Sequence, residues 1–391
     1  MKIIAITTIR SDYGLMSNLY RELDNDMNIE FKLLVAGTHI SPTFGLTVQE
    51  IENDNFDILL KSETLLDSDS KVGRLKSASI MLLSFIDAVA NYEPDLILYA
   101  GDREDVAVGA LLGAYLSIPT MHFFSGDHAA DGHVDNPIRH ATSKLTTFHC
   151  ASIKQHAERL RAIGEPDERI SVIGSIALDK FLAHKNLPLK SLFDQLNIET
   201  QPEKLALIIF HPIEEEKKYA CEILRIIISE LLSKGIYCFV GAPNSDPNNR
   251  QLLNLHEEYS ESEMVHFYKN MPREMFLTIF NNSELIIGNS SAGILEAASI
   301  PIPTVNVGAR QVGRLAGENV IFCDAEKKSI KNAIERALSK KFKSFIANIE
   351  NPYGDGKSVE KALNLIKTIN FVDILYKKED PLYVNKDIID G

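Results

Sequence analysis

Short apolar segments alternate with helix-compatible segments along almost the whole chain, and this alternation constrains the fold more than any other feature of the sequence. Apolar runs such as Ile3–Thr8, Leu96–Ala100 and Leu205–Phe210 have the length and composition of buried strands. Helix-compatible segments such as Lys71–Asn91 and Ser329–Leu338 separate them. This spacing is typical of a parallel sheet covered by helices on both faces. We therefore predict an α/β fold with two doubly wound, Rossmann-like domains that face a central cleft.

The division into domains follows from one polar segment near the middle of the chain. Residues 179–204 contain Pro188 and Pro202 and few apolar residues, so we expect a linker there. The N-terminal domain then spans residues 1–178, and the C-terminal domain spans residues 205–370. We expect the tail, residues 371–391, to pack back on the N-terminal domain.

The charge balance and the absence of certain patterns exclude several classes of protein. The net charge of -13 argues against a general nucleic-acid surface. No apolar run reaches the length of a membrane span, and the first residues do not resemble a signal peptide. The four cysteines are scattered, and no histidine or cysteine spacing fits a metal site. We therefore expect a cytoplasmic protein without a metal or another cofactor.

A turn of small residues, G-N-S-S at 288–291, follows one of the predicted strands. Ser290 and Ser291 stand where the helix-compatible segment Ala292–Ser299 begins, and Arg310 follows in the next loop. Exposed N–H groups at a helix start favour an anion, and arginine binds phosphate through two donors. The pattern fits a diphosphate site. The alternative is an ordinary β-α-β corner with a solvated arginine.

Three carboxylates of the N-terminal domain fall in loops where ligands of open α/β sheets bind. Asp102 and Asp127 follow two predicted strands, and Asp135 stands before a predicted helix. Clustered carboxylates shift each other's pKa values apart, so one can donate a proton while another accepts one. For Asp135 the alternative is a simple helix cap.

Three histidines, His39, His140 and His211, fall at similar positions near strand ends or helix starts. A single histidine is more often a structural residue than a ligand-binding one, and the sequence leaves both roles open. No G-x-G-x-x-G or G-x-x-x-x-G-K-[ST] motif is present, which argues against a dehydrogenase or a P-loop enzyme.

Ten motifs in collinear order resemble the hydrolysing UDP-N-acetylglucosamine 2-epimerases of sialic-acid and legionaminic-acid biosynthesis. The motifs are T-I-R-S-D-Y-G, G-T-H-I-S-P-T-F-G, A-G-D-R-E-D, G-D followed by D-N-P-I-R-H, V-I-G-S-I-A-L-D, F-H-P, A-P-N-S-D-P, I-I-G-N-S-S-A-G-I-L-E, V-G-A-R-Q-V-G-R and N-P-Y-G-D-G. Each is weak alone, but the set covers nearly the whole chain. The first loop differs from the G-T-R-P-E that is typical of the non-hydrolysing relatives.

The resemblance implies a GT-B-type fold in which the second domain holds most of the UDP. It also implies anti elimination of UDP to a 2-acetamidoglucal, followed by addition of water and release of the free 2-epimer. No cofactor is implied, and a homo-oligomer, a dimer or a tetramer, is expected from the family alone.

Site residues follow from the resemblance position by position. Asp102, Asp127 and Asp135 match the catalytic carboxylates of the family. Contacts to the substrate or the nucleotide are implied for Arg10, His39, Arg139, His140, Gly174, His211, Asn244, Ser290, Ser291, Glu296 and Arg310.

The chain departs from the family pattern at one carboxylate. Many members have G-G-E followed by T-E-G, whereas this chain has S-G-D at 125–127 and H-A-A-D-G at 128–132. The shorter Asp127 is consistent with a different sugar, such as a 2,4-diacetamido-2,4,6-trideoxy sugar. Two other functions stay open: a GT-B glycosyltransferase, and a nucleotide-sugar-binding protein without turnover.

Overall fold

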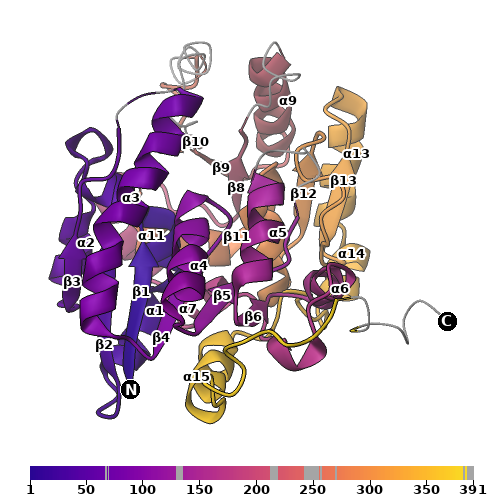
Figure 1. Ribbon diagram of the computed structural model, residues 1–391. Coiled ribbons are helices and arrows are strands. Elements are labelled where there is room, and N and C mark those ends of the chain that lie inside the picture. Colours follow the sequence, from indigo (N-terminus) through magenta and orange to yellow (C-terminus); the bar gives the residue numbers. More distant parts are fainter. Residues whose placement is uncertain are drawn as a thin grey trace. The chain divides into compact units, whose positions relative to one another are not determined.

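The chain forms two compact units in this computed structural model (Figure 1). Unit 1 comprises Met1–Lys180 and Gly356–Gly391, and unit 2 comprises Phe181–Asp355. The structure describes residues 1–66, 68, 70–128, 135–211, 219–241, 255, 258–268, 271–381 and 384, with the backbone alone at 135. Within these ranges, no helix has the length and apolar character that crossing a bilayer requires.

Unit 1 contains a sheet of seven parallel strands in the order β3-β2-β1-β4-β5-β6-β7. The strands are β1 (Lys2–Thr7), β2 (Glu30–Val35), β3 (Ile58–Lys61), β4 (Leu96–Ala100), β5 (Thr120–Phe123), β6 (Phe148–Ala151) and β7 (Ile170–Val172). Its helices are α1 (Arg10–Asp24), α2 (Val48–Asn53), α3 (Lys71–Tyr92), α4 (Glu104–Leu116), α5 (Asp135–Leu145), α6 (Lys154–Ala162) and α15 (Ser358–Thr368), and α7 (Ala177–Leu182) crosses into unit 2.

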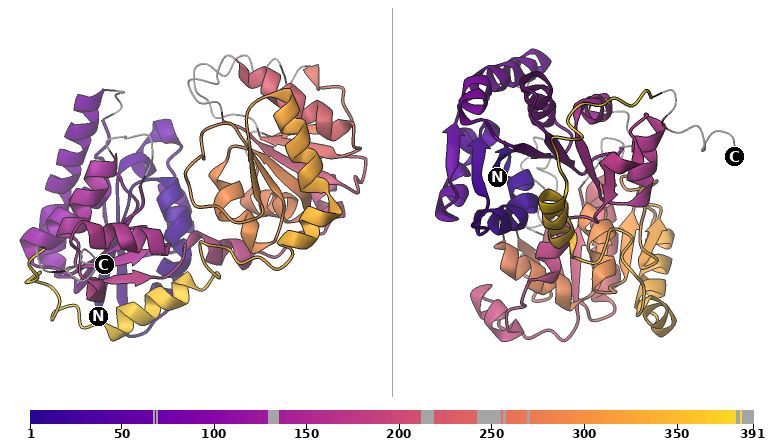
Figure 2. Two further views of the ribbon diagram at one scale, coloured as in Figure 1. Left: turned by 90° about the vertical axis from the view of Figure 1, so that its right-hand side faces the viewer. Right: turned by 60° about the horizontal axis from the view of Figure 1, so that its bottom comes forward.

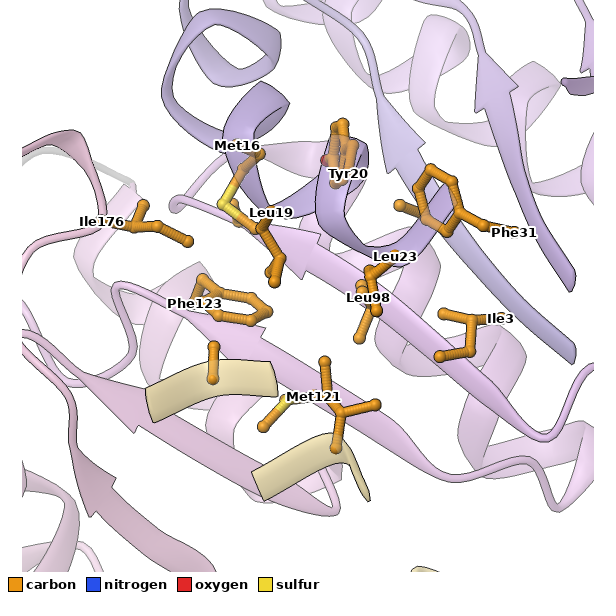
Figure 3. Close-up of a cluster of buried hydrophobic side chains, with 14 of the residues drawn as sticks. Ile3, Met16, Leu19, Tyr20, Leu23, Phe31, Leu98, Met121, Phe123 and Ile176 are labelled. Carbon is orange, nitrogen blue, oxygen red and sulfur yellow. The ribbon is translucent and has the colours of Figure 1, made fainter. Parts of the chain in front are cut away.

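The central strands of unit 1 are largely apolar because helices cover both faces of the sheet. Successive side chains of a strand point to opposite faces. Ile3 therefore packs with the buried face of α1, where Leu19 and Leu23 lie (Figure 3). Ile4 packs on the other face with Phe85 of α3. Each face buries its own hydrophobic core, which stabilises the sheet and fixes its register.

Unit 2 repeats this architecture with six parallel strands in the order β10-β9-β8-β11-β12-β13. The strands are β8 (Leu205–Ile209), β9 (Tyr237–Gly241), β10 (Val265–Tyr268), β11 (Ser283–Gly288), β12 (Thr304–Val307) and β13 (Val320–Cys323). Its helices include α8 (Leu189–Gln195), α9 (Ala220–Leu232), α11 (Arg273–Asn282), α12 (Ser291–Leu295), α13 (Lys327–Leu338) and α14 (Lys340–Ile346). The predicted α/β class with two parallel-sheet domains is confirmed.

The segment predicted as a linker, residues 179–204, is folded. Helix α7 runs into it, and α8 lies within it. Leu192 and Phe193 of α8 are buried in the core of unit 2. Short helices with only two or three apolar residues are hard to distinguish from a polar linker, because so few residues carry little periodicity.

The second boundary also differs from the prediction, because the chain returns to unit 1 at Gly356 and not at residue 371. Helix α15 packs against α1, at the bottom of unit 1 in the left view of Figure 2. The Asp179 carboxylate accepts hydrogen bonds from the N–H groups of Ser358 (3.1 Å) and Val359 (2.7 Å), and so caps the start of α15. The points where the chain leaves and re-enters unit 1 are thereby joined.

The C-terminal segment (residues 371–381) continues along unit 1 after α15, and Arg169 holds it there. Phe371 is buried in the core of unit 1. The Arg169 side chain, only 2% exposed, pairs with Glu379 at 3.1 Å. It also donates hydrogen bonds to the backbone carbonyls of Ile374 and Tyr376. A buried guanidinium is tolerated here because its donors are satisfied by the segment it holds.

Candidate functional site

Asp102 and Asp127 lie at the same edge of the unit 1 sheet. They follow β4 and β5, which are neighbouring parallel strands. The Gly101 N–H donates to the Phe123 carbonyl at 3.2 Å, which joins the two strand ends. His122 Nε2 bonds the Gly101 carbonyl at 2.8 Å, and burial lowers the pKa of His122 to about 3. This histidine is therefore neutral and fixes the turn that carries Asp102.

Arg139 of α5 forms an ion pair with Asp102. Its side chain is 4% exposed, whereas that of Asp102 is 34% exposed. The guanidinium also donates to the Asn136 side chain at 3.2 Å. Asp102 is thus held from its buried side, and its other side is open to a ligand. Helix α5 begins at Asp135, whereas the prediction placed Asp135 just before the helix; the Asp135 side chain lies outside the described residues.

Asp127 is held by His156 of α6, whose Nε2 lies 3.2 Å from the carboxylate. The backbone N–H of His128 donates to the same carboxylate at 2.8 Å. Burial opposes ionisation of Asp127, but His156 and the charge of Arg139 outweigh it and hold its pKa well below the usual range. Asp127 is therefore a carboxylate at neutral pH and can accept a proton.

His140 of α5 stacks on His128, with ring centroids 5.6 Å apart. Nδ1 of His128 lies 3.3 Å from Nε2 of His140, so one ring donates and the other accepts. Burial and the cationic charge of its neighbours, Arg139 among them, lower the pKa of His140. Among the residues that the structure describes, no group of three or more His, Cys, Asp or Glu side chains is arranged to hold a metal ion.

Two further predicted contacts of unit 1 lie near the ends of β1 and β2. Arg10 is the first residue of α1, 72% exposed, and pairs with Glu50 of α2 at 2.8 Å. The segment expected to be a loop after the first strand is thus the first turn of this helix. His39 is fully buried, and its two ring nitrogens contact Thr7 at 3.0 Å and Thr47 at 2.7 Å. Since both nitrogens are engaged inside unit 1, this histidine is structural, unlike the predicted substrate contact.

The remaining two positions add little to the geometry. Gly174 follows β7 with φ of +91°, in the left-handed region that favours glycine. Asn244 lies outside the described residues.

The corresponding edge of unit 2 carries the small-residue turn after β11. Gly288 has φ of +138°, and a Cβ there would lie 2.0 Å from the Ile209 carbonyl of β8. Ser290 caps α12 and accepts a hydrogen bond from the Ala292 N–H at 3.3 Å. The predicted helix over Ala292–Ser299 is shorter in the structure, because α12 spans only Ser291–Leu295 and a 3-10 turn follows. Hydroxyl and guanidinium groups therefore matter more here than the dipole of so short a helix.

Glu296 and Arg310 both follow the small-residue turn in the sequence. Burial raises the pKa of Glu296 to about 7, against the opposing charge of Arg273. Arg310 is exposed and donates to the Asn289 carbonyl at 3.2 Å. Burial of part of the guanidinium and the charge of Arg314 lower the pKa of Arg310. A cation and a protonatable carboxyl are thus placed at one edge of the sheet.

Asn289 and His156 are two residues that the sequence analysis did not identify. Asn289 is fully buried and bonds the backbone of His211 at both of its side-chain atoms. His156 stands inside a predicted helix, with nothing in the local pattern to connect it with Asp127. For Asn289 one signal was available, since a polar residue directly after a glycine at a strand end often fixes a turn.

Comparison of the chain with known proteins shows which family it belongs to. The family described as UDP-N-acetylglucosamine 2-epimerase matches residues 21–367. A UDP-N,N'-diacetylbacillosamine 2-epimerase (hydrolyzing) from Legionella pneumophila is 32% identical over 94% of this chain and 96% of its own length. The chain belongs to the UDP-N-acetylglucosamine 2-epimerase family. The resemblance drawn from the ten motifs is thereby confirmed.

Two other relatives agree with this assignment. A GDP/UDP-N,N'-diacetylbacillosamine 2-epimerase (hydrolyzing) from Campylobacter jejuni is 32% identical and covers 96% of this chain and 98% of its own. The crystal structure of UDP-GlcNAc 2-epimerase from Neisseria meningitidis bound to UDP-GlcNAc has a TM-score of 0.78 to this chain. It covers 94% of this chain and 100% of its own at 18% identity, so it supports the fold alone.

Proposed function

We propose that this member of the 2-epimerase family is a hydrolysing enzyme. It converts a UDP-2-acetamido sugar of the UDP-N-acetylglucosamine type into UDP and the free 2-epimer, of the N-acetylmannosamine type. The observation that carries the proposal is the pair of carboxylates, Asp102 and Asp127, fixed at adjacent strand ends by Arg139 and His156. Two carboxylates in different settings are the groups that proton removal and return at one carbon require.

The reaction proceeds in two balanced steps. A carboxylate of unit 1 removes the proton at C2, the electrons form the C1–C2 double bond, and the C1–O bond breaks so that UDP leaves with its electron pair. Water then adds to the glucal: its oxygen bonds to C1 while a carboxylate accepts one of its protons, and a carboxylic acid delivers a proton to C2 from the opposite face. Asp127 is ionised at neutral pH, as a proton acceptor must be. Asp102 and Asp135 match the other catalytic carboxylates of the family.

Unit 2 supplies the groups that hold UDP. Arg310 is exposed, and its Nη1 donates to the Asn289 carbonyl, so the guanidinium has further N–H donors to offer to the diphosphate. Ser290 and Ser291 add hydroxyl donors beside it, and Glu296 accepts from the ribose hydroxyls. Stabilising the charge that develops on the departing diphosphate lowers the barrier to elimination.

A second candidate substrate is a UDP-2,4-diacetamido-2,4,6-trideoxy sugar. Two of three relatives at 32% identity are named for UDP- or GDP/UDP-N,N'-diacetylbacillosamine, which is a sugar of this class. The third, from Neisseria meningitidis, is named UDP-N-acetylglucosamine 2-epimerase and supports the first candidate. The shorter Asp127 in place of the usual glutamate leaves more room beside the sugar. A relative from Escherichia coli, 28% identical, is named polysialic acid biosynthesis protein P7, which supports a role in nonulosonic-acid biosynthesis.

The test is incubation of the protein with each UDP-sugar in D2O, followed by proton NMR. We expect free UDP and a free manno-configured sugar with deuterium at C2, without any acceptor present. A UDP-linked 2-epimer as the product would indicate the non-hydrolysing reaction. An intact donor that reacts only when an acceptor is added would indicate a glycosyltransferase, and binding without turnover would indicate a non-catalytic protein.

A site test uses Asp102→Asn, with Asp167→Asn as the control. Asp167 is a carboxylate of the same unit, 65% exposed, that pairs with Arg161. We expect Asp102→Asn to bind UDP with unchanged affinity and to lose UDP release, and we expect the control to retain both. Normal turnover of Asp102→Asn would refute the assignment.

A further inference from the structure

Strands β8, β11 and β12 are neighbours in the sheet of unit 2 (Figure 1). One buried residue connects the segments that follow them. Asn289, directly after β11, is fully buried. Its Oδ1 accepts from the His211 N–H at 2.7 Å, and its Nδ2 donates to the His211 carbonyl at 2.8 Å. Its own N–H donates to the Ile209 carbonyl at 3.0 Å. Three hydrogen bonds therefore fix the chain after β8 to the chain after β11.

The backbone carbonyl of Asn289 fixes the third segment, the loop after β12. It accepts from Gln311 Nε2 at 3.0 Å and from Arg310 Nη1 at 3.2 Å. Gln311 is only 3% exposed, so its bond is shielded from water. This one residue thus joins the segments that carry His211, Ser290 and Arg310.

The close approach of β8 and β11 is a precondition for these bonds. Gly288 lies so near the Ile209 carbonyl that no side chain fits between them. The short distance lets the Asn289 amide reach His211 with both of its polar atoms. Because the amide pairs with the donor and the acceptor of one residue, it fixes both the position and the orientation of that residue.

Asn289 itself is not a ligand-binding group, because both side-chain polar atoms are used inside unit 2 and no part of the side chain is exposed. Its contribution concerns geometry. Charge stabilisation depends on donors that are already in place before the ligand arrives. A shift of the His211 backbone or of the Arg310 loop would cost affinity for a diphosphate and leave contacts elsewhere on the nucleotide unaffected.

We propose that Asn289 is a positioning residue that pre-organises the diphosphate-binding groups of unit 2, assisted by Gln311. This inference rests on the proposed function, since it takes a nucleoside diphosphate as the ligand. Within the nucleotide, the inference assigns the residues that Asn289 positions to the diphosphate and not to the nucleoside. It predicts that loss of the Asn289 contacts lowers the preference for UDP over uridine.

The test compares the dissociation constants of UDP and uridine, measured by ligand-observed NMR titration. We expect Asn289→Asp, which lacks the Nδ2 donor, to weaken UDP binding about tenfold or more and uridine binding less than twofold. Gln311→Met removes one bond to the Asn289 carbonyl and keeps the Asn289 side chain, so we expect a smaller loss in the same direction. This second variant carries the test if Asn289→Asp does not fold.

The matched control is Asn319→Ala. Asn319 is also fully buried in unit 2, and its Nδ2 donates to the Ile302 carbonyl at 2.9 Å. It precedes β13 and so lies at the opposite edge of the sheet. We expect this variant to lower stability and to leave the ratio of UDP to uridine affinity unchanged.

The outcomes separate the two proposals. Equal weakening of UDP and uridine in Asn289→Asp and Gln311→Met, or unchanged binding of both, would overturn the positioning role and leave the proposed function intact. Absence of UDP binding by the unmodified protein would overturn the proposed function and the positioning role together.

Discussion

Replacing Arg169 with methionine tests how strongly the C-terminal segment is held to unit 1. Methionine has a similar length and is apolar, so the change removes the hydrogen bonds and leaves most of the volume. The guanidinium donates to Glu379 and to the carbonyls of Thr147, Ile374 and Tyr376. All of these acceptors lose their donor at once, and the segment keeps Lys377, which bonds Glu165 and the Ser143 carbonyl, as its other polar contact with unit 1.

The expected cost follows from burial. The Arg169 side chain is 2% exposed and that of Glu379 is 28% exposed. Breaking a buried ion pair by removing one partner costs about 3–5 kcal/mol. For a unit of this size, that loss lowers Tm by roughly 6–20 °C. Calorimetry measures the shift, and hydrogen exchange of peptides from each unit shows which unit is affected.

Arg225→Ala in unit 2 is the control. Arg225 pairs with Glu258 at 2.8 Å, but the two side chains are 47% and 43% exposed. Exposed pairs contribute about 0–1 kcal/mol. We expect exchange in residues 371–381 to rise sharply in Arg169→Met and to stay unchanged in the control. Equal Tm values for the two variants would refute the reasoning from burial.

Three further predictions concern the candidate site. Gly288→Ala places a Cβ 2.0 Å from the Ile209 carbonyl at φ of +138°, so we expect urea denaturation to show about 3 kcal/mol or more of destabilisation. Gly235→Ala, at φ of +68° with nothing within 4 Å, should cost only about 1–2 kcal/mol, and equal costs would contradict the steric argument. The pKa of Glu296 is about 7 in the folded state and has its usual value of 4.5 in the unfolded chain, so between these pH values the folded state binds the proton more tightly. The contribution of Glu296 to the free energy of unfolding therefore falls as pH rises through this window. The free energy of unfolding of Glu296→Gln should therefore equal that of the unmodified protein at pH 4 and exceed it by about 3 kcal/mol at pH 8. A constant difference across this range would contradict the assignment of the pKa shift to burial. His156→Asn should raise the pKa of Asp127, because the partner that keeps this pKa low is lost. Carbon NMR of the Asp127 carboxylate measures the titration, and an unchanged pKa would show that another group is responsible.

The sequence predicted the class of the fold and the edges of the sheets where polar residues gather. Long apolar runs such as those of β1 and β8 were recognised because both faces of each sheet are covered, which makes these strands largely apolar. Strands β3, β6 and β13 were not predicted, since each has only four residues and two of them mix apolar with polar or charged side chains. So short a segment carries little periodicity of its own.

Within the candidate site, the sequence placed Asp102 and Asp127 at adjacent strand ends and identified Arg139 as a site residue, but it did not show which carboxylate Arg139 holds and did not identify His156. Arg139 and His156 come from helices, and their pairing with the two carboxylates depends on how α5 and α6 pack on the sheet. His39 shows the opposite error. Its position after a strand suggested a ligand contact, whereas burial among Thr7 and Thr47 makes it part of the interior. Local pattern indicates where a chain turns and does not show which side chains the turn buries.

The return of the chain to unit 1 bears on the order in which the protein folds during synthesis. The ribosome makes Met1–Lys180 first, then all of unit 2, and only afterwards α15 and the segment that Arg169 holds. At about 5–20 residues per second, unit 1 waits roughly 10–40 s for its last elements, while unit 2 is already available to fold. In that interval Phe371 is missing from its core, and the Arg169 guanidinium lacks Glu379 and the carbonyls of the C-terminal segment. The nascent first unit therefore exposes apolar surface and an unpaired charge until α15 and the segment after it have been made.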